Sequence, residues 1–180
     1  MKGIAIFGGS FDPIHLGHIN ISLAILSHFH FDTFNFLPCK IPVIKGPTHV
    51  DSQHRIAMLQ LALNPYPNFN LDLREVTRPT PSYMVDTLRC YRQEFPKESI
   101  TLILGYDSFA SLTLWKEWEI LLQLANILVA NRPFEDQNGL DAIMDDLLKS
   151  HQCLSTTEFL ENPFGKIFLF DAGSYTISSS

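Results

Sequence analysis

The stretch that decides the fold lies near the start of the chain and reads Gly8-Gly9-Ser10-Phe11-Asp12-Pro13-Ile14-His15-Leu16-Gly17-His18. It follows directly on the apolar run Gly3–Phe7, so the order predicts a buried strand, a glycine loop and then a helix. Glycines let the backbone approach an anion, and the first turn of a helix offers unpaired N–H groups at its positive end. His15 and His18 add side-chain donors. The stretch therefore predicts a phosphate-binding site.

Two other interpretations of the same stretch stay open. A Gly-Gly pair after a strand is often a plain turn. His15 and His18 are three residues apart, so they share a helix face and could bind zinc, although no His-Glu-x-x-His pattern is present. The loop matches neither the P-loop pattern nor Gly-x-Gly-x-x-Gly. We rank phosphate binding first, zinc second and the plain turn third.

The composition is that of a globular protein. The chain has 180 residues, 46% of them hydrophobic and 18% charged, which suits a single domain over residues 1–180 with a sizeable core. No apolar stretch approaches the roughly 20 residues that span a bilayer, and no signal-peptide pattern opens the chain. The cysteines Cys39, Cys90 and Cys153 are odd in number and widely spaced, which argues against a disulfide framework. A reducing, cytoplasmic location is expected.

The charge balance limits the partners of the chain. The formal net charge of −6 disfavours a broad nucleic-acid or acidic-membrane surface. A small phosphorylated substrate needs only a local positive pocket, and the first third of the chain has positive or protonatable groups for one. They are His15, His18, Lys40, Lys45, His49, His54 and Arg55. We take His49 and His54 as ordinary surface groups.

Strand and helix patterns alternate along the chain. Short buried strands are expected at Gly3–Phe7, Thr33–Leu37, Phe69–Arg74, Ile100–Leu104, Asn126–Ala130 and Lys166–Phe170. Helices are expected at Leu16–Ser27, from Asp51 to Leu63, along the face Met84, Leu88, Tyr91 and Phe95, and at Leu114–Leu124 and Gly139–Lys149. This order predicts an α/β fold, a doubly wound parallel sheet with helices on both faces. Ligands bind such sheets outside the carboxyl ends of the strands, where the loops at Gly8 and Gly105 should open.

Four stretches carry a family resemblance. Gly8 to His18 is similar to the signature of nucleotidyltransferases that share a His/Thr-x-Gly-His motif. Three later stretches narrow it to the nicotinate-nucleotide adenylyltransferases, and they occur in family order. They are Thr80–Leu88 with Met84 where the family has Thr, Leu104–Phe109 with Tyr106 in place of Ala and followed by Trp115, and Ile177–Ser180. The resemblance covers essentially the whole chain and implies a Rossmann-like architecture.

The resemblance implies adenylyl transfer from ATP to nicotinate mononucleotide, with Mg²⁺ accompanying ATP. The acceptor is a phosphate that is already largely ionised, since its second pKa is about 6. Neither a protein base nor a covalent intermediate is needed, so the enzyme must hold two anions in line and neutralise developing charge. The absence of an obvious nucleophile–base pair from the sequence is consistent with this chemistry. A homodimer is possible.

The resemblance also implies site residues. The catalytic residues are His15 and His18, and no residue is assigned as a metal ligand. The residues expected to contact ATP are these two with Gly8, Gly9, Ser10, Phe11, Gly105, Asp107, Arg132, Ile177 and Ser178. The residues expected to contact nicotinate mononucleotide are Lys45, Thr80, Tyr83, Asp107 and Trp115. Three alternatives stay open: a solvated Lys45, an Asp107 that caps a helix, and a Trp115 that is an ordinary core or surface residue, although Trp118 could equally be the core one.

Two further expectations concern the end of the chain and the alternative functions. The family continues with an arginine about three residues after Ser180 and then a C-terminal helix, so we expect a shortened chain rather than a natural truncation. The alternatives are a pantetheine-phosphate or nicotinamide-nucleotide adenylyltransferase, a non-catalytic nucleotide-binding remnant, and a zinc module. Pro81-Ser82-Tyr83 and Trp115 speak against the pantetheine-phosphate enzyme.

Overall fold

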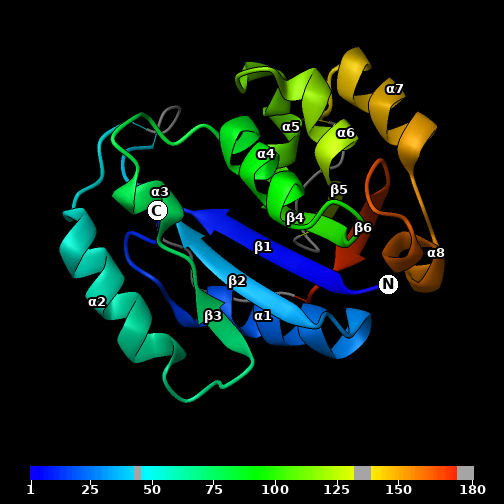
Figure 1. Ribbon diagram of the computed structural model, residues 1–180. Helices are drawn as coiled ribbons and strands as arrows, with labels where there is room; N and C mark the ends of the chain where they lie inside the picture. The colour runs from blue at the N-terminus through cyan, green and yellow to red at the C-terminus, as the bar shows by residue number, and fades with distance from the viewer. Residues whose placement is uncertain (43–45, 132–138, 174–180) are drawn as a thin grey trace.

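The computed structural model describes residues 1–42, 46–131 and 139–173 of the chain (Figure 1). The strands are β1 (Gly3–Gly9), β2 (Thr33–Pro38), β3 (Phe69–Leu71), β4 (Ser99–Gly105), β5 (Asn126–Asn131) and β6 (Ile167–Asp171). The helices are α1 (Leu16–Phe29), α2 (Ser52–Leu63), α3 (Arg74–Thr77), α4 (Met84–Glu94), α5 (Tyr106–Ala110), α6 (Leu121–Leu124), α7 (Ala142–His151) and α8 (Thr156–Glu161), with 3₁₀ turns η1 (Leu112–Leu114) and η2 (Trp118–Ile120).

The six strands form one parallel sheet in the order β3-β2-β1-β4-β5-β6. The chain runs outward from β1 to β3, returns to β4 beside β1, and then runs outward to β6. Strand order therefore reverses between β1 and β4, and a ligand crevice is expected outside the carboxyl ends of these two strands. This topology confirms the predicted doubly wound, Rossmann-like α/β fold.

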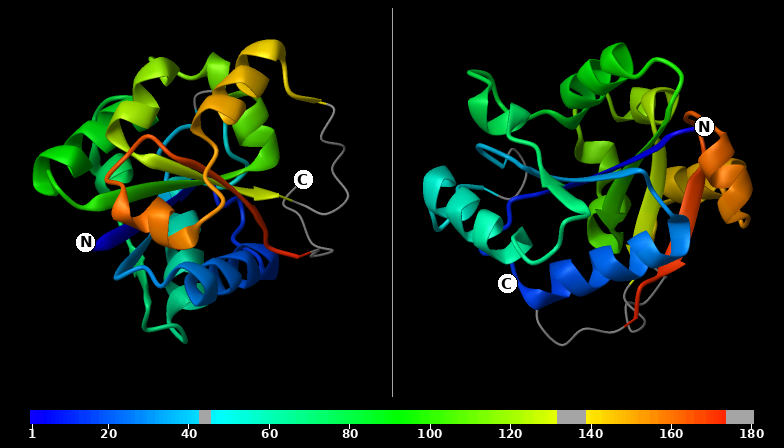
Figure 2. Two further views of the ribbon diagram at one scale, coloured as in Figure 1. Left: turned by 90° about the vertical axis from the view of Figure 1, so that its right-hand side faces the viewer. Right: turned by 60° about the horizontal axis from the view of Figure 1, so that its bottom comes forward.

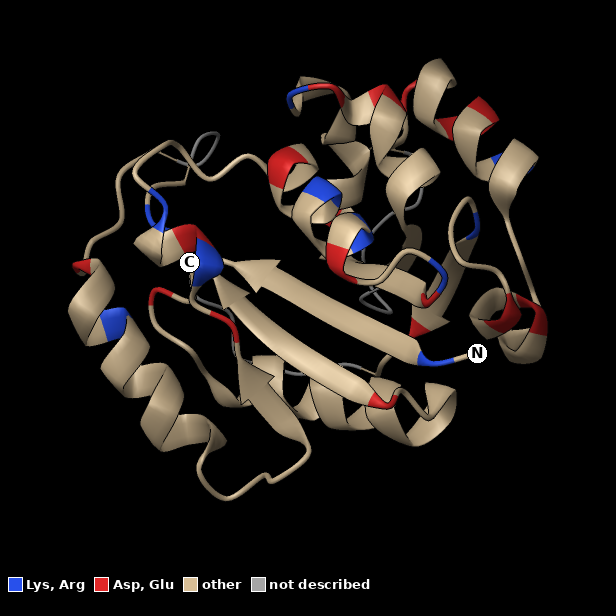
Figure 3. Cartoon of the chain, viewed as in Figure 1, with Lys and Arg blue, Asp and Glu red and all other residues tan. Residues whose placement is uncertain are grey.

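Helices cover both faces of the sheet, and each face has its own apolar core (Figures 1 and 2). Along β1, Ile4 and Ile6 point into the core shared with α4, whereas Ala5 and Phe7 point into the core shared with α1 and α2. This alternation follows from the period of two in a strand. Full burial of each large side chain contributes about 1.5–3 kcal/mol. Strands β1 to β5 carry no charged residue, and in the described part of the chain the charges lie on helices and loops, apart from Asp171 at the end of β6 (Figure 3).

The predicted strands are confirmed in number and place, but the third one is shorter than expected. It ends at Leu71, because Asp72 turns the chain: its Oδ1 accepts from the backbone N–H of Arg74 at 2.9 Å. Arg74 therefore begins α3 instead of ending the strand. Short side-chain-to-backbone bonds of this kind compete with regular strand pairing.

The predicted helix Leu114–Leu124 is wrong as a single element. The structure has η1, η2 and α6 there, and Glu117 adopts a left-handed backbone with φ of 50°. The Glu117 carboxylate pairs with Arg89, with Nη2 and Oε1 2.8 Å apart. The left-handed residue ends a helical path, and the pair with Arg89 fixes where it does so.

The other predicted helices lie close to their expected bounds, whereas α3, α5 and α8 were not predicted. Asp51 is the N-cap of α2, and its side chain accepts from the N–H of His54 at 3.0 Å. The last predicted helix runs over Ala142–His151 instead of Gly139–Lys149, with Asp141 as its cap. None of the helices in the described part of the chain is long and apolar enough to cross a membrane.

Candidate active site

The glycine loop predicted to bind phosphate lies at the carboxyl end of β1. Gly8 and Gly9 are the last residues of the strand. A Cβ on Gly8 would lie 2.8 Å from Cε of Met84, so the start of α4 packs closely over the loop. Phe11 has a φ of 44° and is only 2% exposed, and its ring packs edge-on against Phe7 at a centroid distance of 5.7 Å. The loop thus has one fixed path, anchored by a buried aromatic ring.

His15 and His18 lie at the start of α1, where they stack on each other. Their ring centroids are 3.7 Å apart, with an angle of 29° between the planes. His15 is the N-cap, and its backbone N–H donates to Nδ1 of His18 at 3.3 Å. Because Nδ1 accepts, a neutral His18 carries its proton on Nε2. The first turn of α1 has no acidic residue, so the positive end of the helix is not offset there.

The second predicted loop, at Gly105, opens at the neighbouring strand. Register pairs Phe7 with Ile103, so the ends of β1 and β4 lie side by side. Gly105 is exposed, and a Cβ there would meet nothing within 4 Å. Gly105 itself is the N-cap of α5, so Asp107 lies inside the first turn, exposed, and is not the capping residue. This removes the helix-cap alternative for Asp107.

The segment before α4 reaches the same edge from the other face. Thr80 is exposed, and Tyr83 is half-buried as the N-cap of α4. The backbone N–H of Lys40 donates to Oγ of Ser82 at 3.1 Å, which ties this segment to the end of β2. The Nζ of Lys116 lies 4.5 Å from the ring centroid of Tyr83, so the chain around Trp115 also approaches it.

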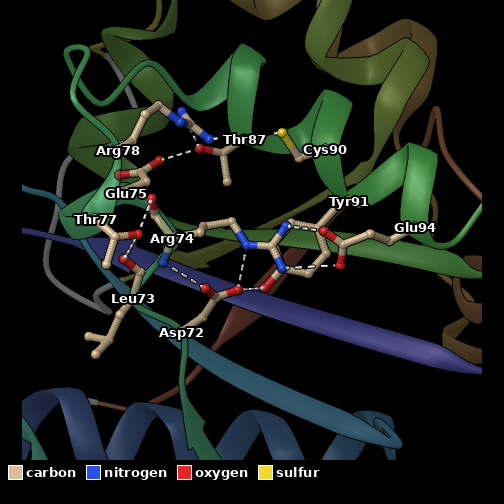
Figure 4. Close-up of polar contacts among 10 residues, drawn as sticks. All are labelled: Asp72, Leu73, Arg74, Glu75, Thr77, Arg78, Thr87, Cys90, Tyr91 and Glu94. Carbon is tan, nitrogen blue, oxygen red and sulfur yellow. Dashed lines mark hydrogen bonds and ion pairs between the residues drawn. The ribbon is translucent and has the colours of Figure 1, made fainter.

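A buried polar network joins the elements on either side of this segment (Figure 4). Glu75 is only 2% exposed, and Oγ1 of Thr87 donates to its Oε1 at 2.6 Å. Arg78 in turn donates to Oγ1 of Thr87 at 3.3 Å. Burial raises the pKa of the Glu75 carboxyl, and the Thr87 hydrogen bond lowers it by less. The network holds the two ends of the Thr80–Tyr83 segment, α3 and α4, against each other.

A second network joins α3 to the outer part of α4 (Figure 4). The guanidinium of Arg74 donates to Asp72 at 2.7 Å and to Glu94 at 3.0 Å, and it lies 3.8 Å above the ring of Tyr91. The Tyr91 hydroxyl donates to Asp72. Burial raises the pKa of Tyr91, so this hydroxyl stays protonated as a donor.

Arg55 is a residue of this edge that the sequence-based assignment missed. It lies on α2 with no exposed surface, and it donates to the carbonyls of Ser10, Cys39 and Lys40. Arg55 shares the buried face of α2 with Leu59 and Leu63. A charged residue at the i, i+4, i+8 spacing of an apolar face was the available signal.

Four predicted site residues lie outside the described part of the chain: Lys45, Arg132, Ile177 and Ser178. Trp115 and Trp118 are both half-buried against the same core, so burial does not distinguish their roles. In the described ranges no three His, Cys, Asp or Glu side chains gather as a metal site, and His15 and His18 gain no third ligand there.

Comparison with known proteins places the chain in a family. A family profile described as "Cytidylyltransferase-like" matches residues 6–180. A Legionella pneumophila protein named "Probable nicotinate-nucleotide adenylyltransferase" is 48% identical over all of this chain and 85% of its own length. A Pseudoalteromonas atlantica protein of the same name is 40% identical over 98% of this chain and 80% of its own.

Solved structures agree on the fold. The Plasmodium falciparum nicotinic acid mononucleotide adenylyltransferase complexed with NaAD superposes with a TM-score of 0.70 and 21% identity, over 99% of this chain and 78% of that chain. The same enzyme complexed with APC gives 0.66 at 21% identity, over 99% and 77%. The sheet topology and the sequence identity to the bacterial relatives point the same way. The chain belongs to the cytidylyltransferase-like family and, within it, to the nicotinate-nucleotide adenylyltransferases.

Proposed function

We propose that the protein transfers the adenylyl group of ATP to nicotinate mononucleotide, giving nicotinate adenine dinucleotide and pyrophosphate in NAD biosynthesis. One observation carries the proposal: the glycine loop with its histidine pair, the Gly105 loop and the Thr80–Tyr83 segment lie at one edge of the sheet, where strand order reverses. The bacterial relatives that cover the whole chain are named for the same reaction.

The reaction is a single in-line displacement. An oxygen of the mononucleotide phosphate attacks the α-phosphorus of ATP, and the bond from that phosphorus to the bridging oxygen of pyrophosphate breaks. The attacking phosphate is largely ionised near pH 7, so no protein group has to remove a proton from it. Catalysis then consists of aligning the two anions and stabilising charge on the phosphoryl oxygens.

The β1–α1 loop is assigned to the ATP phosphates. His18 would donate its Nε2 proton to a phosphate oxygen as charge develops, while His15 holds the same phosphates. Gly8, Gly9, Ser10 and Phe11 form the path along which the nucleotide lies, and the N–H groups at the start of α1 add donors.

The neighbouring loops are assigned to the sugars and the pyridine ring. Asp107, exposed behind Gly105, would accept from ribose hydroxyls. Trp115 offers an indole face on which a flat pyridine can stack, and the Nζ of its neighbour Lys116 lies over the ring of Tyr83. Lys45 is assigned to the mononucleotide; Arg132, Ile177 and Ser178 are assigned to ATP.

Mg²⁺ is assigned to the substrate rather than to the protein. The triphosphate of ATP is itself a strong ligand for Mg²⁺. Bound to those oxygens, Mg²⁺ neutralises charge on the phosphates. The residues of the loop then orient the Mg·ATP complex.

The test is a substrate panel. Pyrophosphate release is measured from Mg·ATP with nicotinate mononucleotide, nicotinamide mononucleotide or phosphopantetheine as the acceptor. We expect a kcat/KM for the nicotinate substrate at least about tenfold above the other two. A preference for the amide or for phosphopantetheine would reassign the substrate. Binding of ATP without turnover in any reaction would leave a nucleotide-binding remnant.

Organisation beyond the site stays at the level of sequence prediction. A single nucleotidyltransferase domain over residues 1–180, a homodimer and a cytoplasmic location are each predictions. Light scattering of the purified protein tests the homodimer.

A further inference from the structure

Arg55 is a buried cation surrounded by backbone carbonyls. It has no exposed surface, and in the described part of the chain its hydrogen-bond partners are carbonyl oxygens and include no carboxylate. Nη2 donates to Cys39 at 2.8 Å and to Lys40 at 3.0 Å, while Nη1 donates to Ser10. Burying a charge is costly unless its donors are bonded, and among the described residues Nη1 and Nη2 have partners while the buried Nε has none. The three carbonyl bonds therefore fix the guanidinium where it lies. The position demands a function that an apolar residue on this helix face would not supply.

The three carbonyls belong to two different segments. Ser10 is in the loop after β1, which we assign to ATP, whereas Cys39 and Lys40 follow β2. The fork of one guanidinium therefore sets the separation of these segments. A backbone bond from the N–H of Cys39 to the carbonyl of Gly9, at 3.0 Å, joins them independently. Loss of the side chain should thus loosen the junction without unfolding the sheet.

The contact continues to the segment assigned to nicotinate mononucleotide. Lys40 accepts from Arg55 through its carbonyl and donates from its N–H to Oγ of Ser82 at 3.1 Å. Ser82 lies between Thr80 and Tyr83. A continuous path of Ser10, Arg55, Lys40 and Ser82 therefore links the loop under one substrate to the loop under the other.

We propose that Arg55 is a positioning residue that fixes the spacing between the two substrate-binding segments, a role that rests on the proposed function. It acts through Ser10 and Lys40 and touches neither substrate. In-line transfer depends on the alignment of two separately bound anions, and a misplacement of about 1 Å can cost about 10²-fold in rate. Loss of Arg55 therefore lowers kcat more than it weakens the binding of either substrate alone.

The guanidinium geometry explains why arginine is needed. Its planar fork holds donors in fixed directions, so it can bind carbonyls of two segments at once. A lysine ammonium keeps the charge but is a compact point donor on a flexible stem. Arg55→Lys should retain some of the hydrogen bonds that join the two segments. Arg55→Met, with similar length and no donors, should retain none.

The chain supplies a matched control in Arg92. This arginine also donates to backbone carbonyls, those of Leu124 at 2.6 Å and Pro163 at 2.8 Å among them, but it does so before β5 and β6, at the opposite edge of the sheet. Arg92→Met removes the same kind of bonds away from the site. It should lower thermal stability and leave kcat and both KM values within twofold of the parent.

The experiment measures kcat, both KM values and the binding of each substrate alone for Arg55→Met, Arg55→Lys and Arg92→Met. For Arg55→Met we expect kcat to fall by about 10²-fold while each separate dissociation constant changes by less than about fivefold. Arg55→Lys should recover about tenfold of the loss. A parental kcat in folded Arg55→Met, or the same kinetic loss in Arg92→Met, overturns the proposal. If Arg55→Met does not fold, Arg55→Lys decides instead: its kcat should fall by more than either of its substrate dissociation constants changes, and a parental kcat overturns the proposal.

Amide hydrogen exchange separates this proposal from the proposed function. Arg55→Met should speed exchange at the N–H of Cys39 and of Lys40, and Arg92→Met should not. If the parent does not turn over nicotinate mononucleotide, the proposed function fails, and this exchange result still decides whether Arg55 fastens the two segments. Unchanged exchange rates at the amides of Cys39 and Lys40 in Arg55→Met overturn the positioning role of Arg55.

Discussion

The sheet has an amino edge, where its strands begin, and a carboxyl edge, where they end. The two edges use the same kind of hydrogen bond for different purposes. At the amino edge, Asn126 is fully buried: its Nδ2 donates to Oγ of Ser99 and to the carbonyls of Phe159 and Asn162, and its Oδ1 accepts from the N–H of Lys166. At the carboxyl edge, Arg55 likewise donates to carbonyls. Both edges are thus joined by donor-rich side chains bonded to backbone.

The surroundings of these bonds differ. The amino edge closes on itself, because the bonded groups come from the buried starts of β4 and β5, from α8 and from the segment that joins α8 to β6. The carboxyl edge leaves groups exposed: Gly105 with open space above its Cα, Asp107 and Thr80. The comparison teaches that one edge serves stability and the other holds loops apart for a ligand. Five changes, from the largest expected effect to the smallest, test that division.

The largest effect is expected for His18→Ala at the carboxyl edge. Removal of a donor that acts on the developing charge should lower kcat by about 10²–10⁴-fold. Steady-state pyrophosphate release measures it. His28→Ala, on an exposed histidine in the last turn of the same helix, is the control. Parental turnover by His18→Ala would remove the histidine from the mechanism.

At the amino edge, Asn126→Ala should act on stability alone. It deletes hydrogen bonds to groups that are buried, at a cost of about 2–4 kcal/mol in the free energy of unfolding. Chemical denaturation followed by circular dichroism gives this value. The kcat measured well below the denaturation midpoint should equal the parental kcat. A tenfold fall in kcat would contradict a purely stabilising role for the amino edge.

Trp115→Ala should weaken the acceptor substrate. Loss of a stacking face costs about 1–3 kcal/mol, so the KM for nicotinate mononucleotide should rise by about tenfold with little change in the KM for ATP. Trp118→Ala is the matched comparison, since both indoles are half-buried against the same core. A larger rise for Trp118→Ala would exchange their roles.

Gly105→Ala asks whether a ligand passes close to the backbone of β4. The added Cβ meets no protein atom within 4 Å, and φ is −70°, so the melting temperature should hold or rise slightly. A nucleotide lying against this residue would be displaced, and the KM for ATP should rise several-fold. Unchanged KM values would mean that ATP does not approach Gly105.

The smallest effect is a pH trend at Glu75. Burial raises its pKa above the ordinary value of 4.5, so the folded state binds the proton more tightly than the unfolded state. Parental stability therefore loses a contribution as pH rises from about 4.5 through the raised pKa. Glu75→Gln cannot titrate and can still accept from Thr87.

The stability of Glu75→Gln relative to the parent should accordingly grow with pH over that interval and then level off. Denaturation midpoints between pH 4 and pH 8 provide the comparison, and Glu161→Gln, on an exposed glutamate, gives the background from removing one negative charge. A relative stability that falls with pH would contradict a carboxyl whose pKa is raised by burial.

Much of the fold could be predicted because buried parallel strands leave a direct trace in the sequence. Strands such as β1 and β4 are continuous apolar runs, and Asp51 marks the start of α2. The end of β3 at Asp72 and the break in the expected helix at Glu117 could not be predicted, because they depend on bonds from these side chains to Arg74 and Arg89.

The site was predictable where it is local in sequence. The histidine pair and the glycine loop are contiguous with one strand and one helix, so their placement followed from the pattern. Arg55 was missed because its partners lie 15 to 45 residues away, and no local pattern indicates which carbonyls a buried arginine will meet. Trp115 and Trp118 stay undecided for the same reason, since a ligand distinguishes them and burial does not.

The division between the edges is tested most directly by a crystal structure with nicotinate mononucleotide and a non-hydrolysable ATP analogue bound together. The account predicts that the triphosphate lies along Gly8–His18, with the pyridine ring beside Trp115 and Tyr83 at the carboxyl edge. A nucleotide bound at the amino edge near Asn126, or a pyridine ring that contacts neither aromatic residue, would contradict it.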